Sequence, residues 1–72
     1  MTDLSADQIA AALERFRQRR AVALRRLELI AQGATLTYED GTPIDMASEK
    51  RRQEQVAADM DRRIAALERT VH

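Results

Sequence analysis

The residues in this sequence whose type and spacing could do chemistry are basic. From position 15 to position 26 the stretch RFRQRRAVALRR contains six arginines and no acidic residue. If this stretch is helical, three of its arginines lie within about 40° of one another around the helix axis. A second basic cluster, KRR, follows at positions 50–52. The candidate contacts are Arg15, Arg19, Arg26, Lys50, Arg51 and Arg52.

Two uses of these basic residues remain open. They can form a surface that faces the phosphates of DNA or an acidic protein partner. They can also form a solvated helix face with scattered ion pairs. The sequence has neither a recognition-helix signature nor a short turn between two helices, so sequence-specific DNA binding is not expected.

Catalytic, cofactor-binding and metal-binding motifs are absent from the sequence. It contains no Cys and a single His, His72, so neither a thiolate zinc site nor a histidine cluster is expected. Asp59 and Asp61 would point in different directions on a helix, which makes them a poor carboxylate pair for acid–base catalysis. There is no glycine-rich phosphate loop. We therefore predict a protein that is not an enzyme and that binds no cofactor.

Length and composition indicate one small, highly charged domain over residues 1–72. The chain has 12 basic and 12 acidic residues, so its formal net charge is zero. A chain of this size buries only about 60% of its unfolded surface, so neighbouring subunits are expected to contribute to its stability. Neither a long apolar run nor a signal-peptide pattern occurs, so no membrane contact is expected.

The elements that must position the basic residues are two helices. Ser5 and Gln8 are spaced for a capping box at the start of the first helix. Gly33 is placed to end this helix in the left-handed conformation, which gives a helix over about 6–32. Apolar residues recur along it every three or four positions. Those assigned to the core are Ile9, Leu13, Phe16, Leu24 and Leu27.

A second helix is predicted over about 49–70, with Ser48 as its N-cap. Its apolar residues form a narrow seam that fits one partner helix, so the two helices are expected to pack antiparallel. The seam residues assigned to the core are Val56, Met60, Ile64 and Leu67. Arg20 falls inside the apolar stripe of the first helix. Either its stem lies along the core edge with its charge in solvent, or it contacts a subunit or a substrate.

Between the helices the hydrophobic pattern changes from a period of 3.6 residues to a period of 2, which is typical of strands. Asp40-Gly41 is a turn signal, and a three-residue turn over 39–41 collects the apolar residues on one face. The sequence thus predicts a β-hairpin over about 35–46. The fold class is α+β, with two antiparallel helices and an inserted two-stranded antiparallel β-hairpin. The hairpin residues assigned to the core are Leu36, Tyr38, Ile44 and Met46.

Two further surfaces are candidate contacts. Val22 and Leu29 are apolar, and they lie about 140° from the centre of the predicted core stripe, so we expect them to contact another subunit. The turn of the predicted hairpin is acidic and its edges are open, which suits docking. The candidate docking tip consists of Glu39, Asp40, Gly41 and Thr42.

The order of elements, together with the stretches LTYEDGTPIDM and RRIAALE, resembles the gpW family of head–tail joining proteins of lambda-like tailed phages. The similarity spans nearly the whole chain. Its specific parts are the Asp-Gly turn, the apolar Ile44 and Met46 after it, and the segment 64–68. The resemblance implies two antiparallel helices with an inserted hairpin. The span between Met46 and Ile64 is longer than in that family, so the second helix begins earlier or a loop is added.

The resemblance also implies a structural function. Members of the family form a ring of identical subunits under the portal of a DNA-filled head, continue the DNA channel and dock the next neck or tail protein. The implied partners are further copies of the chain, a portal protein, that neck or tail protein and, without sequence specificity, double-stranded DNA. The implied location is the neck of a virion or phage-like particle assembled in the host cytoplasm. Two alternatives are a small DNA-binding or regulatory module that uses the basic helix face, and a helical-hairpin assembly chaperone.

Overall fold

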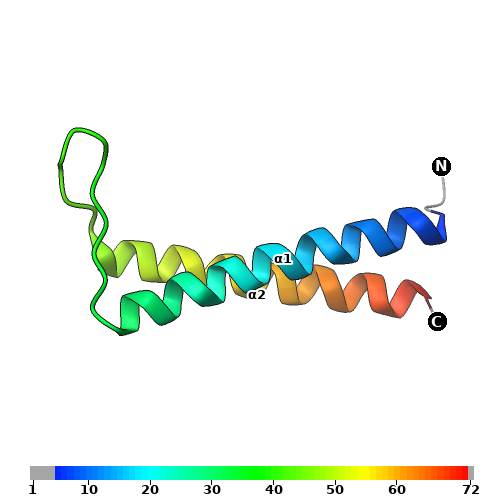
Figure 1. The fold of residues 1–72 in the computed structure, drawn as a ribbon. Coiled ribbons are helices and arrows are strands. Elements are labelled where there is room, and N and C mark those ends of the chain that lie inside the picture. Colours follow the sequence, from blue (N-terminus) through cyan, green and yellow to red (C-terminus); the bar gives the residue numbers. More distant parts are fainter. Residues whose placement is uncertain (1–4, 72) are drawn as a thin grey trace.

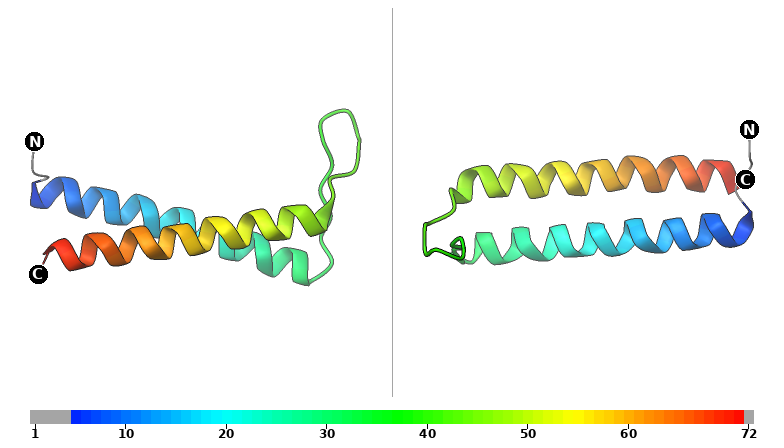
Figure 2. Two further views of the ribbon diagram at one scale, coloured as in Figure 1. Left: turned by 180° about the vertical axis from the view of Figure 1, so that it is seen from behind. Right: turned by 90° about the horizontal axis from the view of Figure 1, so that it is seen from above.

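Two antiparallel α-helices joined by an exposed loop make up the structure, a computed structural model that describes residues 5–71 (Figure 1). Helix α1 spans Ala6–Ala31 and helix α2 spans Met46–Val71. The helices run side by side and cross at a shallow angle, as the two views of Figure 2 show. The molecule is elongated, with extents of 46 × 23 × 16 Å. The start of α1 and the end of α2 lie at one end, and the loop lies at the other.

The predicted α+β fold is wrong, because the described part of the chain is a helical hairpin that contains neither a strand nor a sheet. A loop over residues 32–45 takes the place of the predicted β-hairpin over 35–46. Among the described residues its β-type pairing is limited to one isolated bridge between Thr37 and Pro43.

Apart from the half-buried Ile44, the loop over residues 32–45 is exposed to solvent, which explains why its pairing stops after one bridge. Leu36 is 46% exposed and Tyr38 is 60% exposed, although the sequence pattern predicts both as core residues. Figure 1 shows the loop rising away from the helix pair. A two-stranded ribbon whose apolar face stays in water is marginally stable at best, so an alternating pattern alone does not form strands here.

The tip of the loop is a tight turn in the register expected for a three-residue connection. The Tyr38 N–H donates to the Thr42 carbonyl at 2.8 Å, and Gly41 takes a φ of +86°, in the left-handed region. The Thr42 N–H donates to Asp40 Oδ1 at 2.9 Å. Hydrogen bonds from Thr42 lower the pKa of the Asp40 carboxyl, so this acid is charged at neutral pH.

Helix α1 begins directly behind the capping box that the sequence indicates. The Gln8 N–H donates to Ser5 Oγ at 3.1 Å, and the Ser5 N–H donates to Gln8 Oε1 at 2.9 Å. Each bond satisfies a backbone donor that the first turn of a helix cannot pair internally.

Gly33 terminates α1 through its backbone. It takes a φ of +93°, and its N–H donates to the Ile30 carbonyl at 3.0 Å. The Ala34 N–H donates to the Leu29 carbonyl at 2.9 Å. These two bonds form a Schellman motif, which requires a left-handed residue after the helix.

Replacing Gly33 with alanine should lower the free energy of unfolding by about 1–2 kcal/mol. The loss comes from the backbone alone, because a Cβ at this position meets no atom within 4 Å. Thermal unfolding followed by circular dichroism measures it. Gly33→Asn, which tolerates the left-handed region better, should recover part of the loss. An alanine variant as stable as the parent would contradict the Schellman ending.

Helix α2 begins at Met46, three residues before the predicted boundary, because Asp45 caps it in place of Ser48. Asp45 Oδ1 accepts from the Ala47 N–H at 3.1 Å, and Asp45 Oδ2 accepts from the Ser48 hydroxyl at 2.7 Å. The Asp45 carbonyl also accepts from the Glu49 N–H at 3.0 Å. Ser48 is therefore a donor in the first turn, and an acid sits at the positive end of the helix dipole.

Replacing Asp45 with alanine should lower the melting temperature at neutral pH. Hydrogen bonds from the Ser48 hydroxyl and the Ala47 N–H lower the pKa of the Asp45 carboxyl. A lowered pKa stabilises the folded chain above about pH 4, and this contribution disappears as the pH falls through the lowered value. The difference in melting temperature between variant and parent should therefore shrink towards about pH 2. A difference that stays constant across this range would rule out a charged cap.

The interface between the helices is built mainly from small side chains. Ala12 and Ala23 of α1 are buried, as are Ala57 and Met60 of α2. Met60, 3% exposed, is the largest apolar side chain among the buried described residues. Gln53, 2% exposed, is a buried polar residue that sequence analysis does not anticipate.

The other predicted core residues lie at the edge of this interface or outside it. Leu24 is exposed, like Leu36 and Tyr38, so these three are not core residues. Two helices form a single seam, and one partner helix cannot cover an apolar stripe as wide as that of α1. The half-buried predicted core residues are Ile9, Leu13, Phe16, Leu27, Ile44, Met46, Val56, Ile64 and Leu67.

Candidate functional site: an arginine-lined groove

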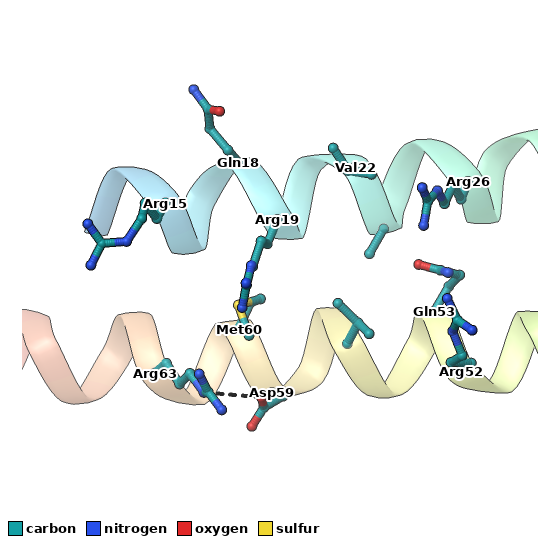
Figure 3. Close-up of a pocket in the computed structure, with 12 residues that line it drawn as sticks. Arg15, Gln18, Arg19, Val22, Arg26, Arg52, Gln53, Asp59, Met60 and Arg63 are labelled. Carbon is teal, nitrogen blue, oxygen red and sulfur yellow. Dashed lines mark ion pairs between the residues drawn. The ribbon is translucent and has the colours of Figure 1, made fainter. Parts of the chain in front are cut away.

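A groove runs between α1 and α2 on one face of the helical hairpin, and arginines from both helices line it (Figure 3). We call it the arginine groove. Its volume is about 610 Å³, which falls within the range of about 300–1,000 Å³ for ligand-binding clefts. The arginines are Arg15, Arg19 and Arg26 of α1, and Arg52 and Arg63 of α2.

The floor of the arginine groove is mainly apolar, with the buried Gln53 as its polar member, and it rests on the buried helix interface. Ala23, 1% exposed, and Met60 are its most buried apolar residues, and the Gln53 amide is held by a hydrogen bond that its Nε2 donates to Glu49 Oε1 at 2.8 Å. Val56 is half-buried beside them, and Val22 is half exposed at the α1 edge. A ligand seated in the groove would therefore cover apolar surface while it meets positive charge at the rim.

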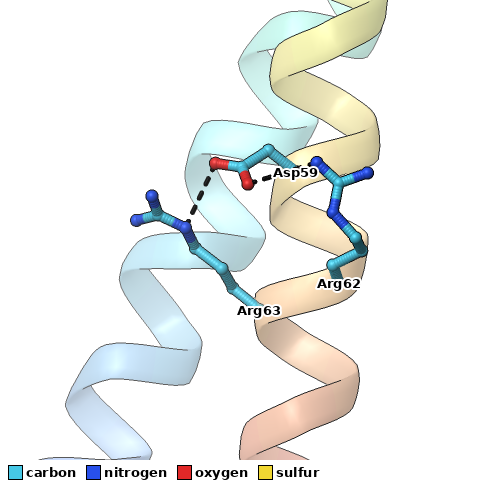
Figure 4. Close-up of polar contacts among 3 residues, drawn as sticks. All are labelled: Asp59, Arg62 and Arg63. Atoms are coloured by element: carbon cyan, nitrogen blue, oxygen red, sulfur yellow. Dashed lines mark hydrogen bonds and ion pairs between the residues drawn. The ribbon is translucent and has the colours of Figure 1, made fainter.

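Among the described residues, Asp59 is the one carboxylate that lines the arginine groove, and it is already shared between two arginines. Asp59 Oδ2 lies 3.1 Å from Arg63 Nε, and Asp59 Oδ1 lies 3.4 Å from Arg62 Nη2 (Figure 4). The Arg63 guanidinium also lies over the Phe16 ring, with its carbon 5.6 Å from the ring centroid. These contacts fix the position of Arg63 and leave Asp59 little capacity to balance other charges.

The remaining arginines of the groove lack close acidic partners. Within residues 5–71, Arg15, Arg19 and Arg26 form no ion pair. Arg52 Nε lies 3.9 Å from Glu49 Oε2, at the outer limit of an ion pair. Four of the five guanidinium groups are therefore available to an anionic ligand.

The opposite face of the helical hairpin carries complementary charges. Arg17 Nη2 lies 3.3 Å from Glu68 Oε1, and Arg20 Nε pairs with Asp61 Oδ1. We call these two pairs between the helices the ionic seam. Arg20 is partly buried along the edge of the helix interface, and its charge meets Asp61. Its place inside the apolar stripe is thus explained within one chain.

The two faces differ in how their charge is balanced. In the ionic seam, arginines of α1 meet acids of α2, whereas in the arginine groove arginines of α1 face arginines of α2. Like charges on facing helices repel, although solvent weakens the repulsion because these side chains are exposed. An acidic ligand replaces this repulsion with attraction. The groove therefore has the charge distribution expected of a binding site for an anion.

Four of the six predicted basic contacts line the groove, and they come from both helices. Lys50 and Arg51 do not, because successive residues of a helix are about 100° apart and only one of the KRR cluster faces the groove. Arg51 Nη2 instead donates to Ser48 Oγ at 3.1 Å. The four residues in the groove are Arg15, Arg19, Arg26 and Arg52.

Val22 lines the groove beside the arginines, whereas Leu29, its predicted companion, does not. The position of Val22 beside the arginines can be predicted from the sequence spacing. Val22 follows Arg19 by three positions and precedes Arg26 by four, so all three residues share a face of the helix. Arg63 is a groove residue that sequence analysis does not select. Its position depends on how α2 is placed against α1, which no local pattern specifies.

Comparisons with protein-family models, with curated proteins and with solved structures find no match to this chain. The resemblance to the gpW family therefore rests on its short sequence matches. In the described part of the chain, no helix is long and apolar enough to cross a membrane. No group of three or more His, Cys, Asp or Glu side chains gathers there in a way that could hold a metal ion.

Proposed function

We propose that the chain is a small non-enzymatic docking protein whose arginine groove binds an acidic, partly apolar segment of a partner protein. One observation carries the proposal: arginines of both helices face one another above an apolar floor, while the other face of the same helices is paired. Acids in place of the arginines of one helix would add ion pairs on this face, each worth about 0–1 kcal/mol.

The apolar floor favours a protein segment over a phosphate backbone as the ligand. A phosphate backbone supplies negative charge, but it offers no apolar side chains to cover Val22 and Val56. An acidic segment with apolar residues supplies both, as in complexes where a partner helix or strand lies in a groove. The small core is a second reason to expect a bound segment. A segment that binds the folded chain, and not the unfolded chain, stabilises the fold.

A peptide-binding titration tests the proposal. A fluorescein-labelled peptide with glutamates on one face and leucines on the other should bind the chain at low ionic strength, as measured by fluorescence anisotropy. Arg19→Glu should weaken this binding by about tenfold or more, equivalent to about 1.4 kcal/mol. Circular dichroism of the variant verifies that both helices remain folded.

Arg25 offers a matched control on the same helix. It lies outside the groove, and its Nη1 is 3.1 Å from Glu28 Oε2 on the same helix. Arg25→Glu should leave peptide affinity within about twofold of the parent. Equal weakening by both substitutions would show a non-specific charge effect and would contradict docking in the groove. Tighter binding of random duplex DNA with a steep salt dependence would favour the DNA-binding alternative instead.

A second candidate is the structural head–tail adaptor that the gpW resemblance implies. It rests on the short sequence matches of that resemblance. One of them, the Asp40-Gly41 turn, is a tight turn at the loop tip, whereas the inserted β-hairpin that the resemblance implies is absent from the described residues. An acidic portal surface is also a suitable ligand for the arginine groove. Mass spectrometry of purified phage-like particles should then detect the chain in a fixed ratio to the portal protein. Its absence from finished particles would exclude the adaptor and favour an assembly chaperone.

A further inference from the structure

We infer that the segment that occupies the arginine groove is the loop of a second copy of this chain, so that copies associate head to tail. The inference rests on the proposed function, because it names the acidic segment that the groove binds. Three properties of the loop over residues 32–45 support it: its charge, its exposed apolar side chains and its position.

The loop carries negative charge without positive charge. Its 14 residues include Glu39, Asp40 and Asp45 and contain neither Lys nor Arg. Asp45 caps α2, while Glu39 and Asp40 are exposed at the tip. The net charge of zero for the whole chain thus conceals an acidic loop and a basic groove, which are complementary surfaces of one molecule.

The loop also presents the apolar groups that the groove floor requires. Leu36 and Tyr38 are among the large hydrophobic residues of the chain that remain exposed. Tyr38 directly precedes the two acids of the tip, and Leu36 lies two positions before Tyr38. A tyrosine ring packs well against guanidinium groups, and Phe16 already accepts Arg63 in this way. Two apolar side chains followed by two acids match an apolar floor bordered by arginines.

The position of the loop directs it towards another copy. Figure 1 shows the loop standing clear of the helices at one end, so it leaves the groove of its own chain open. In the right-hand view of Figure 2 the loop points towards the viewer, and Figure 3 shows the groove from that same side of the helix pair. The tip and the groove thus lie on one side of the hairpin, where a neighbouring copy can contact both.

Charge also determines how the copies can be arranged. Two grooves placed face to face would bring the arginines of one copy against those of the other, which is repulsive. A loop in a groove joins two different surfaces, so two copies joined in this way keep one free groove, on the copy that supplies the loop, and one free loop, on the other copy. Such heterologous contacts build a closed ring or an open filament.

Sedimentation velocity on the whole chain tests the inference. The parent chain should form species larger than a monomer at low ionic strength, and these should dissociate as salt is added. The loop variant Tyr38→Ser/Glu39→Gln and the groove variant Arg19→Glu should each associate at least about tenfold more weakly. Arg25→Glu, outside both surfaces, should associate like the parent. Circular dichroism verifies that every variant is helical.

Mixing the two weakened variants gives the sharpest result. The loop variant keeps an intact groove and the groove variant keeps an intact loop, so the mixture should form one-to-one complexes that do not grow further. A parent chain that stays monomeric while its groove binds the unrelated acidic peptide would overturn the inference and leave the proposed function standing. Self-association that neither variant weakens would also overturn it. Absence of both self-association and peptide binding would overturn the inference and the proposed function together.

Discussion

Replacing Met60 with alanine should unfold most of the helical hairpin at room temperature. Met60 is 3% exposed, and the other buried apolar residues in the described part of the chain are alanines, so its side chain supplies most of the removable core volume. Truncating a buried methionine to alanine lowers the free energy of unfolding by about 2–5 kcal/mol. A domain of this size has only a few kcal/mol of stability, so the loss is comparable with the total.

Thermal and urea unfolding followed by circular dichroism measure this effect. Leu24→Ala is the matched control, because Leu24 is of similar size and lies on α1 at 41% exposure. It should lower the free energy of unfolding by less than about 1 kcal/mol. A Met60→Ala variant no less stable than Leu24→Ala would show that the interface between α1 and α2 is not the stabilising core.

Replacing Ala23 with leucine should lower the free energy of unfolding by about 1–3 kcal/mol. Ala23 is 1% exposed at the contact between the helices, where a larger side chain has no space unless the helices move apart. Separation of the helices also disturbs the floor of the arginine groove, which Ala23 forms together with Met60. The same substitution should therefore weaken peptide binding.

Ala21 provides the control for this substitution. It is exposed on the same helix, so Ala21→Leu should change the stability by less than about 0.5 kcal/mol and should not affect binding. Both effects can be followed in one set of samples, by chemical unfolding and by fluorescence anisotropy. If Ala23→Leu were as stable as Ala21→Leu, the helices would not be in close contact at this position.

Local sequence signals predict the ends of α1 well but the start of α2 less well. Ser5 and Gln8 form the expected capping box, and Gly33 takes the expected left-handed conformation. At the start of α2, Asp45 and Ser48 are both good N-cap residues three positions apart. Only the structure shows that the carboxylate accepts the backbone N–H and that the hydroxyl donates to it.

In the loop, the alternating sequence pattern predicts strands that do not form, and the reason is physical. Alternation around Leu36 and Tyr38 describes a strand with one apolar face, but a strand forms only if that face is covered. The two helices already cover each other with small residues such as Ala23 and Ala57, and the loop lies beyond their ends. Periodicity reports which residues share a face, and it does not report what packs on that face.

The candidate site is also only partly predictable from the sequence. The alignment of Arg15, Arg19 and Arg26 follows from helix geometry alone, so the sequence is sufficient to find it. The opposition of these arginines to Arg52 and Arg63 depends on how α1 and α2 are placed against each other, which is a tertiary property. The contrast between the arginine groove and the ionic seam is likewise visible only when both helices are in place.

The most direct test of the arginine groove as the functional surface is an amide NMR titration of the chain with the acidic peptide. The largest chemical-shift changes should fall on Arg19, Val22 and Arg26, which line the groove. Arg17 and Arg20, in the ionic seam, should change little. Changes concentrated on the ionic seam, or the absence of any change at saturating peptide, would contradict the assignment of function to the groove.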